Sequence, residues 1–274
     1  LQGVNVSKKY DVEIDEIDAC PVQIQGPLSE DLMAKLAGEE LREVPYYGIL
    51  ETKVGGADCV ISQTGFTGEK GYEIYVRDAH ENAEKMWNAV LEAGEEFGLM
   101  VIAPAHHRRI AAGILSWGQD LDHETSPFQV NLSYQVPRNK AADYIGKEEL
   151  EKQRAMMDEG KAPFKMKMVG LTLGGKEITD YAPDFWIVTN TDGDEVGYVT
   201  SPWWSPELET NIALAWVPWE ASEVGTKYMV KLPDEYAESP GVAVNAEIVD
   251  VPFRESVNPN KREVQAAKGL DFAD

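Results

Sequence analysis

Short runs in which apolar and polar residues alternate recur along most of the chain. β-branched and aromatic residues at every second position are typical of strands that bury one face. Such runs predict several strands before the first long helical pattern. In the first part of the chain they are residues 10–17, 19–25, 46–54, 58–63 and 71–76.

Helical patterns lie between these runs. Ser29 precedes a stretch with acidic residues in its first turn, so a helix with Ser29 as its N-cap is expected. Apolar residues spaced by three and four predict an amphipathic helix over residues 79–97, packed on the sheet. A helix opened by Pro104 is expected to reach about Trp117, and another spans about residues 145–159. This mixture predicts an α+β fold with helices on one sheet face.

The last hundred residues change character, because only short alternating runs occur there. They predict a small all-β domain, a barrel or a sandwich. The Gly, Pro and charge cluster at 160–163 marks the expected boundary between domains 1–160 and 164–253, followed by a polar tail over 254–274. The runs are residues 165–173, 185–189, 195–200, 211–217, 227–232 and 242–249.

The charge balance excludes some partners. The chain has 48 acidic and 25 basic residues, a net charge of −23, which opposes binding to nucleic acids or anionic membranes. It contains no apolar run of membrane-spanning length and no signal-peptide pattern, so a cytoplasmic protein is expected. Cys20 and Cys59 lack metal or redox spacing and are expected to be reduced.

Few residues show the spacing of a metal site. The four histidines form no pair with helical metal-ligand spacing, so no metal is expected. Asp120, Asp122 and Glu124 alternate as in a calcium loop but lack its glycine and terminal glutamate, so a solvated or capping loop is expected.

Arg109 and the tryptophan pair Trp203 and Trp204 both require specific surroundings in the folded protein. Arg109 lies in an apolar helical stretch, where its guanidinium requires a carboxylate from the protein or from a ligand. The adjacent Trp203 and Trp204 are expected either to pack on the first domain or to line a pocket.

The segment 61–76 combines a glycine-rich turn with a polar cluster. Gly65, Gly68 and Gly71 separate two strand-like runs, at positions that need positive φ or close backbone approach. The second run carries Glu73 between two tyrosines. A surface hairpin with an ordinary glutamate and a ligand-binding hairpin are both compatible with this pattern.

Several segments together resemble the aminomethyltransferase family, the folate-dependent T-protein of the glycine cleavage system and its relatives. The resemblance rests on Thr64-Gly-Phe-Thr-Gly-Glu-Lys-Gly-Tyr-Glu-Ile-Tyr-Val76 and Arg109-Ile-Ala-Ala-Gly-Ile-Leu-Ser-Trp-Gly-Gln-Asp-Leu121, with further landmarks in order to residue 253. Ile24-Gln-Gly-Pro27 and Val249-Asp-Val-Pro-Phe253 resemble the dimethylsulfoniopropionate demethylase branch. Residues 66–71, Phe-Thr-Gly-Glu-Lys-Gly, instead have the T-protein form, which leaves the substrate open.

The resemblance implies a fold and a cofactor. The fold would be folate-binding lobes of mixed sheet with helices (ferredoxin-like pieces), followed by a β-barrel, and the cofactor would be tetrahydrofolate. By matching position, Glu73 would hold the pterin through two hydrogen bonds, Tyr75 and Phe66 would be aromatic walls, and Arg109 would bind a carboxylate. Phe66 and Tyr75 would also contact the methyl donor, together with Trp117.

The implied activity is tetrahydrofolate-dependent methyl transfer from a small methylated zwitterion such as dimethylsulfoniopropionate. Alternatives are a T-protein that needs a lipoyl carrier protein, a dimethylglycine or sarcosine demethylase, and a non-catalytic folate-binding relative. Family members carry more residues before the position that matches Leu1, so this chain is expected to be an N-terminally truncated piece. The catalytic acidic residue would lie in the missing part, and the piece is expected to be inactive alone.

Overall fold

A computed structural model describes residues 11–138 and 140–254 of the chain. Their contacts define two units. Unit 1 comprises residues up to Gly65 and Glu69–Val101, and unit 2 comprises Phe66–Gly68 and the residues from Ile102 onward. These contact units differ from the sequence domains expected on either side of residues 160–163. The physical reason is that residues after Val101 contribute apolar side chains to the outer surface of the barrel.

Unit 1 contains a four-stranded sheet with the order β1-β4-β3-β2. All three pairings are antiparallel, although a mixed sheet was expected. Each of these strands lies within a few residues of its predicted range. Residues 11–18 form no strand, contrary to the alternation there, and Tyr10 lies outside the described residues. The strands are β1 (Ala19–Gln25), β2 (Ile49–Val54), β3 (Ala57–Ser62) and β4 (Gly71–Arg77).

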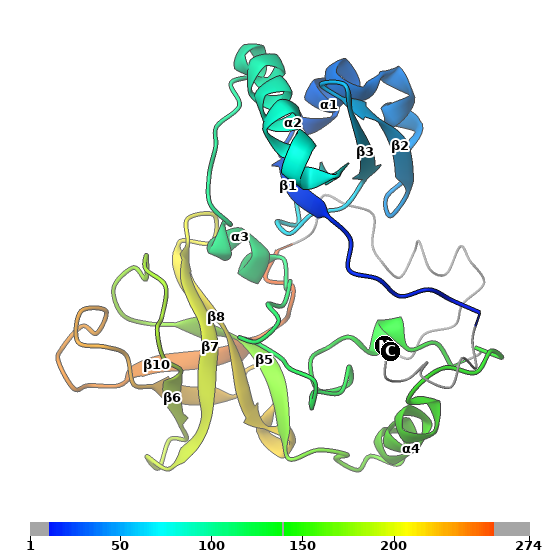
Figure 1. The fold of residues 1–274 in the computed structure, drawn as a ribbon. Helices are drawn as coiled ribbons and strands as arrows, with labels where there is room; N and C mark the ends of the chain where they lie inside the picture. Colours follow the sequence, from blue (N-terminus) through cyan, green and yellow to red (C-terminus); the bar gives the residue numbers. More distant parts are fainter. Residues whose placement is uncertain (1–10, 139, 255–274) are drawn as a thin grey trace. The chain divides into compact units, whose positions relative to one another are not determined.

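Helices α1 (Ser29–Ala37) and α2 (Ala79–Gly94) pack on this sheet (Figure 1). Short 3-10 turns follow them at η1 (Glu39–Glu43) and η2 (Glu95–Phe97). The helices bury Tyr72, Ile74 and Val76 of β4 completely, as the strand alternation requires. Ser29 is not the N-cap that was expected, because Leu28 occupies that position. The buried Ser29 hydroxyl instead donates to the carbonyl of Lys70 at 3.1 Å.

Unit 2 is built on a closed barrel with the order β10-β5-β8-β7-β6-β9, which confirms the predicted barrel domain. Alternating apolar residues from all six strands fill its interior. Strand β8 is buried almost without interruption, because residues that precede the barrel cover its outer face. The strands are β5 (Met166–Leu173), β6 (Trp186–Thr189), β7 (Glu195–Ser205), β8 (Thr210–Pro218), β9 (Lys227–Val230) and β10 (Val244–Val249).

Helix α3 (His106–Ala111) ends earlier than predicted. Gly113 takes φ of +67°, and its N–H donates to the Ile110 carbonyl while Ile114 N–H donates to the Arg109 carbonyl. This is a Schellman motif, for which glycine is the favoured residue. The chain therefore turns at Gly113, and residues up to Trp117 lie in a loop.

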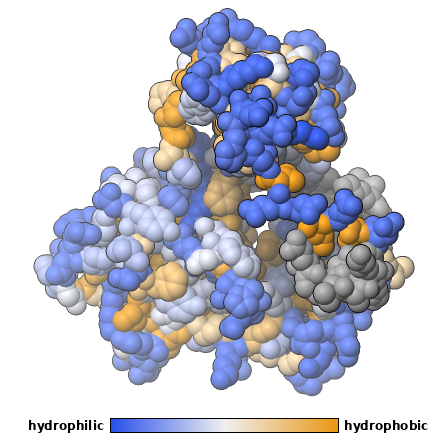
Figure 2. All heavy atoms as spheres, in the orientation of Figure 1, coloured by the Kyte–Doolittle hydropathy of each residue, from blue (hydrophilic) through white to orange (hydrophobic). Residues whose placement is uncertain are grey.

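The remaining elements of unit 2 are helix α4 (Lys147–Asp158) and the 3-10 turns η3 (Ser133–Gln135) and η4 (Trp219–Ala221). Of the expected polar tail, only Arg254 belongs to the described residues, where its Nη2 donates to the Thr67 carbonyl at 3.1 Å. The rest of the tail lies outside them. None of the helices in residues 11–138 and 140–254 combines the length and apolarity needed to cross a membrane. Hydrophilic residues cover much of the visible surface (Figure 2), in keeping with the charge of −23.

Candidate functional site

The loop between β3 and β4 is held by close backbone approach. Gln25 of β1 donates from Nε2 to the Thr64 carbonyl at 3.2 Å. A Cβ atom on Gly65 would lie 2.1 Å from the Gln25 side chain, and one on Gly71 would lie 2.3 Å from it. Gly68 has φ of +74°. Gly68 therefore needs its positive φ, and Gly71 also approaches the Ile24 carbonyl, from which a Cβ would lie 2.6 Å; at Gly65 only the end of the Gln25 side chain would have to move.

Glu73 and Tyr75 of β4 lie on the sheet face opposite the helices. Both are half-buried, whereas their neighbours on the helical face are fully buried. Glu73 is paired with Gln23 of β1 and Ser62 of β3 across the sheet, and its carboxylate accepts a hydrogen bond from the Thr64 hydroxyl. Burial and the adjacent Glu73 carboxylate raise the pKa of Tyr75 above its ordinary value. The face therefore presents an oriented carboxylate next to a neutral phenol.

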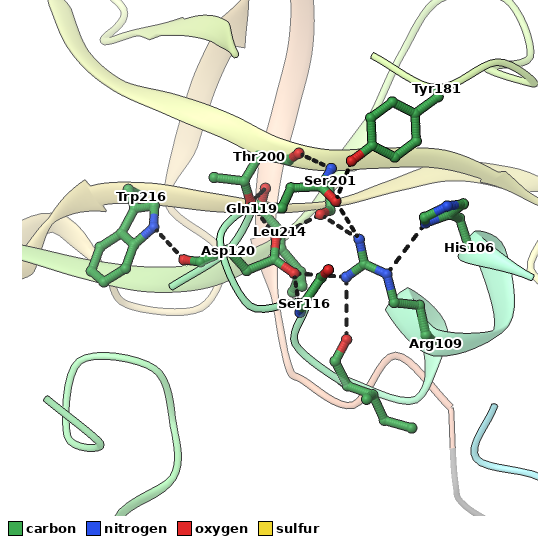
Figure 3. A network of polar contacts seen from close by, with 11 residues as sticks. His106, Arg109, Ser116, Gln119, Asp120, Tyr181, Thr200, Ser201, Leu214 and Trp216 are labelled. Carbon is green, nitrogen blue, oxygen red and sulfur yellow. Dashed lines mark hydrogen bonds and ion pairs between the residues drawn. The ribbon is translucent and has the colours of Figure 1, made fainter. Parts of the chain in front are cut away.

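Arg109 of α3 forms a buried ion pair with Asp120 (Figure 3). Nη1 lies 2.7 Å from Oδ2 of Asp120, and both side chains are essentially inaccessible to solvent. The protein thus supplies the carboxylate that the sequence required for Arg109. A buried pair of this kind is retained only when the remaining donors and acceptors are also satisfied.

Asp120 accepts further hydrogen bonds from unit 2. Its Oδ2 accepts from the Ser116 backbone N–H at 2.8 Å, and its Oδ1 accepts from the hydroxyls of Thr200 at 2.6 Å and Ser201 at 2.5 Å. Its backbone carbonyl accepts from Trp216 Nε1 at 3.0 Å. Asp120 was expected to lie in a solvated or capping loop. It is instead buried and joins the loop after α3 to strands β7 and β8. Asp122 does cap its own loop, because its Oδ1 accepts from the Glu124 N–H at 2.9 Å.

Every N–H donor of the Arg109 guanidinium has a protein partner. Besides Asp120, Nη1 donates to the Ile114 carbonyl at 3.2 Å, and Nη2 donates to Ser201 at 2.7 Å and to Gln119 at 3.3 Å. Nε lies 3.4 Å from Nδ1 of His106. Arginine has five such donors, so a ligand carboxylate would have to displace one of these groups. Direct ligand binding by Arg109 remains a prediction.

Aromatic rings border this network. The His106 ring stacks on Trp203 of β7 with centroids 5.3 Å apart and meets Tyr181 edge-on at 5.1 Å. Tyr181 donates its hydroxyl to Oε1 of Gln119 at 2.8 Å, and Gln119 donates Nε2 to the Thr200 carbonyl at 2.8 Å. Trp203 therefore packs on α3, one of the two arrangements expected for the tryptophan pair.

We expect His106 to make stability depend on pH. Burial, and secondly the Arg109 charge, lower the pKa of His106 below 6.5. The unfolded chain then binds more protons than the folded one between the two pKa values, so this contribution is complete above pH 6.5 and is lost as pH falls towards the folded pKa. His106→Phe keeps a ring on Trp203, and urea unfolding at several pH values should show a smaller slope in this window. In this variant part of the pH dependence of stability should remain, because the pKa of His107 is also lowered.

The exposed His123 provides the matched control. His123→Asn should change the free energy of unfolding at pH 8 by no more than about 0.5 kcal/mol, as usual for an exposed position. An unaltered slope in the His106→Phe variant would contradict the assignment.

The predicted site residues belong to two groups. Glu73 and Tyr75 share one face in unit 1, whereas Arg109, Trp117 and Phe66 belong to unit 2. Trp117 is 68% exposed in the loop that Asp120 anchors, and Phe66 is half-buried in the β3–β4 loop. A joint site of all five residues stays a prediction. No cluster of three metal-ligating side chains occurs within residues 11–138 and 140–254.

Three residues with clear structural roles were not predicted from the sequence: Thr64, Asp120 and Ser201. Thr64 begins the first family landmark and Asp120 is the last residue but one of the second, so the landmarks contained a signal for both. Ser201 carries no local signal, because its partners Arg109 and Asp120 lie more than eighty positions earlier.

The chain matches family models over most of its length. Residues 2–140 match the GCVT N-terminal domain, and residues 167–254 match the glycine cleavage T-protein C-terminal barrel domain. The second match covers the six-stranded barrel observed here.

Similar proteins carry consistent names. An aminomethyltransferase of Geobacillus sp. is 32% identical over 248 residues, which are 89% of this chain and 63% of that protein. An aminomethyltransferase of Clostridium botulinum is 35% identical, with 81% and 58% covered. Dimethylsulfoniopropionate demethylase of Ruegeria pomeroyi is 32% identical, with 85% and 60% covered. The chain thus spans about 60% of the length of these relatives.

The solved structure of glycine cleavage system aminomethyltransferase T from Bartonella henselae has a similar fold. The TM-score is 0.68 at 24% identity, over 89% of this chain and 62% of the other. The two family matches, which include the barrel, lead to one conclusion: the chain belongs to the glycine cleavage T-protein (aminomethyltransferase) family.

Proposed function

We propose that the chain forms part of a tetrahydrofolate-dependent one-carbon transferase that demethylates a small methylated zwitterion such as dimethylsulfoniopropionate. The observation that carries this proposal is the pair Glu73 and Tyr75 on the sheet face opposite α1 and α2, in a chain of this family. The named similarity to a dimethylsulfoniopropionate demethylase supports the donor class.

The residues present fit a pterin. Thr64 occupies one acceptor position of the Glu73 carboxylate, and a carboxylate has about four, so two ring N–H donors can still be accepted. Tyr75 supplies an aromatic wall, and its raised pKa keeps it neutral beside Glu73. Tetrahydrofolate, when bound, supplies the nitrogen that accepts the one-carbon unit.

The task of the protein in such a transfer is positioning, because acceptor and donor must meet in line. An aromatic face attracts a sulfonium or quaternary ammonium group, which suits Phe66, Tyr75 and Trp117 to a cationic methyl donor. Arg109 acts mainly through Asp120, which fixes the loop that carries Trp117. Direct binding of a ligand carboxylate by Arg109 would displace one of the groups that now use its five donors.

An aminomethyltransferase of the glycine cleavage system is the second candidate. It is favoured by residues 66–71, Phe-Thr-Gly-Glu-Lys-Gly, and by the names of most similar proteins. Such an enzyme would need an aminomethylated lipoyl carrier protein as its partner. A dimethylglycine or sarcosine demethylase and a non-catalytic folate-binding protein complete the alternatives.

The test offers tetrahydrofolate to the full-length natural protein with each donor separately: dimethylsulfoniopropionate, dimethylglycine, sarcosine or aminomethylated lipoyl carrier protein. We expect methyl-tetrahydrofolate, measured by mass spectrometry, with dimethylsulfoniopropionate. Methylene-tetrahydrofolate that forms only with the carrier protein would favour the second candidate. Folate binding without product from any donor would contradict transfer and support the non-catalytic alternative.

A further inference from the structure

Helix α4 and the segment before it line a small pocket of about 140 Å³ in unit 2. Three of its lining residues are cationic, namely Arg138, Lys140 and Arg154. The other polar lining residues are Tyr144 and Glu151. This pocket has no part in the function proposed above.

Arg154 is buried in an unusual way. Its side chain is 7% exposed, Nη2 donates to the Val136 carbonyl, and the guanidinium lies 5.0 Å from the centre of the Phe128 ring. Nη1 is buried and has no hydrogen-bond partner among the described residues. An unsatisfied donor on a charged group costs free energy, so a group that fills the pocket and accepts from Nη1 would stabilise the protein. Burial and secondly the Arg138 charge lower the pKa of Arg154, and the Asp158 carboxylate offsets them only in part.

The neighbouring charges leave the pocket with a cationic excess. Arg138 donates to both oxygens of Asp158 at 2.8 Å, so its charge is already matched. Glu151 lies 3.9 Å from Lys147, which offsets its charge. Neither Arg154 nor Lys140 has a carboxylate within 4.0 Å among the described residues, and the Lys140 ammonium lies 4.9 Å from the Tyr144 ring. Two unmatched cations at one pocket are unexpected in a chain of net charge −23.

Water is the simplest possible occupant. At about 30 Å³ per molecule, the pocket holds about four or five waters, which could accept from Nη1. Water brings no charge, however, and leaves Arg154 and Lys140 without a counterion. A small oxyanion satisfies the donor and the charge together.

We propose that this pocket binds a small oxyanion, a phosphate or a carboxylate, with Nη1 of Arg154 as the deep donor and the exposed Lys140 as the cation at its mouth. The inference is independent of folate binding, because every residue in it belongs to unit 2 and none is assigned to the cofactor.

Calorimetric titration of the 274-residue chain with millimolar inorganic phosphate at constant ionic strength tests this directly, with acetate as a second arm and sodium chloride as the reference. We expect saturable phosphate or acetate binding, and the tighter of the two identifies the class. Arg154→Lys keeps the charge but removes Nη1, and should weaken binding about tenfold or more. Lys140→Gln should weaken it about two- to fivefold, since an exposed ion pair contributes about 1 kcal/mol or less.

Lys152→Gln is the matched control. Lys152 is an exposed residue of α4 that lies 3.5 Å from Glu149 and does not line the pocket, so its loss removes the same charge elsewhere. If Arg154→Lys fails to fold, the comparison of Lys140→Gln with Lys152→Gln still decides. The proposal is overturned if neither anion binds more than chloride, or if both lysine variants bind equally well.

Discussion

Asp120→Asn is expected to lower the free energy of unfolding of unit 2 by about 3–5 kcal/mol, the usual cost of leaving one partner of a buried ion pair without its countercharge. The asparagine amide keeps the size of the side chain but places a nitrogen donor among groups that already donate. Arg109, Ser116, Thr200 and Ser201 all donate to this carboxylate. The loop after α3 should lose its attachment to β7.

Urea unfolding followed by tryptophan fluorescence measures this loss of stability in unit 2. All tryptophans of the chain except Trp87 belong to unit 2. Asp122→Asn, two positions later on an exposed side chain, is the matched control and should change stability by no more than about 0.5 kcal/mol. The double variant Arg109→Met with Asp120→Leu removes both charges and should recover much of the loss. A loss below about 1 kcal/mol for Asp120→Asn would show that the network does not hold this loop.

Glu73→Gln should weaken tetrahydrofolate binding about ten- to hundredfold if Glu73 anchors the pterin. Hydrogen bonds to a charged group contribute about 1.5–3 kcal/mol, and the amide can accept through only one of its two terminal atoms. The fold should tolerate the change, because Glu73 is half-buried and the amide can still accept from Thr64. Folate titration of the full-length protein, followed by fluorescence, gives the affinity.

Glu51→Gln is the control for this variant. Glu51 of β2 lies across from Val60 on the same sheet face, but it is exposed and pairs with Arg77 at 3.1 Å. Its substitution should leave folate affinity unchanged. Equal affinity of the Glu73→Gln and parent proteins would remove Glu73 from the site, and the proposed function would lose its main support.

Local pattern predicted the strands well and the packing poorly. The strands of both units were visible in the sequence because one face of each must be apolar, and that requirement repeats every two residues. The length of α3 was wrong because apolar spacing continues past Gly113, whereas the backbone turns there. The division into the two contact units was not predicted, for a related reason. A Gly and Pro cluster identifies a loop, but only the contacts of α3 with β7 and β8 show which residues pack together.

The roles of the polar residues were likewise predictable only where the signal is local in the sequence. Glu73 and its glycine loop could be selected because their signal lies within sixteen consecutive residues. The environment of Asp120 could not, because Thr200 and Ser201 are eighty positions away and the surrounding sequence resembles a solvated loop. Long-range pairing of this kind leaves no periodic trace in a single sequence.

The assignment of Phe66–Gly68 to unit 2 limits how the protein can be divided. This tripeptide lies between two stretches of unit 1 in the sequence, so no single cut separates the units. A fragment that begins at Ile102 would lack the Thr67 carbonyl that accepts from Arg254, and Gly68, where a Cβ would lie 2.5 Å from that of Ala112. Exchange of unit 2 between relatives should therefore preserve a glycine at position 68, where a side chain would meet Ala112.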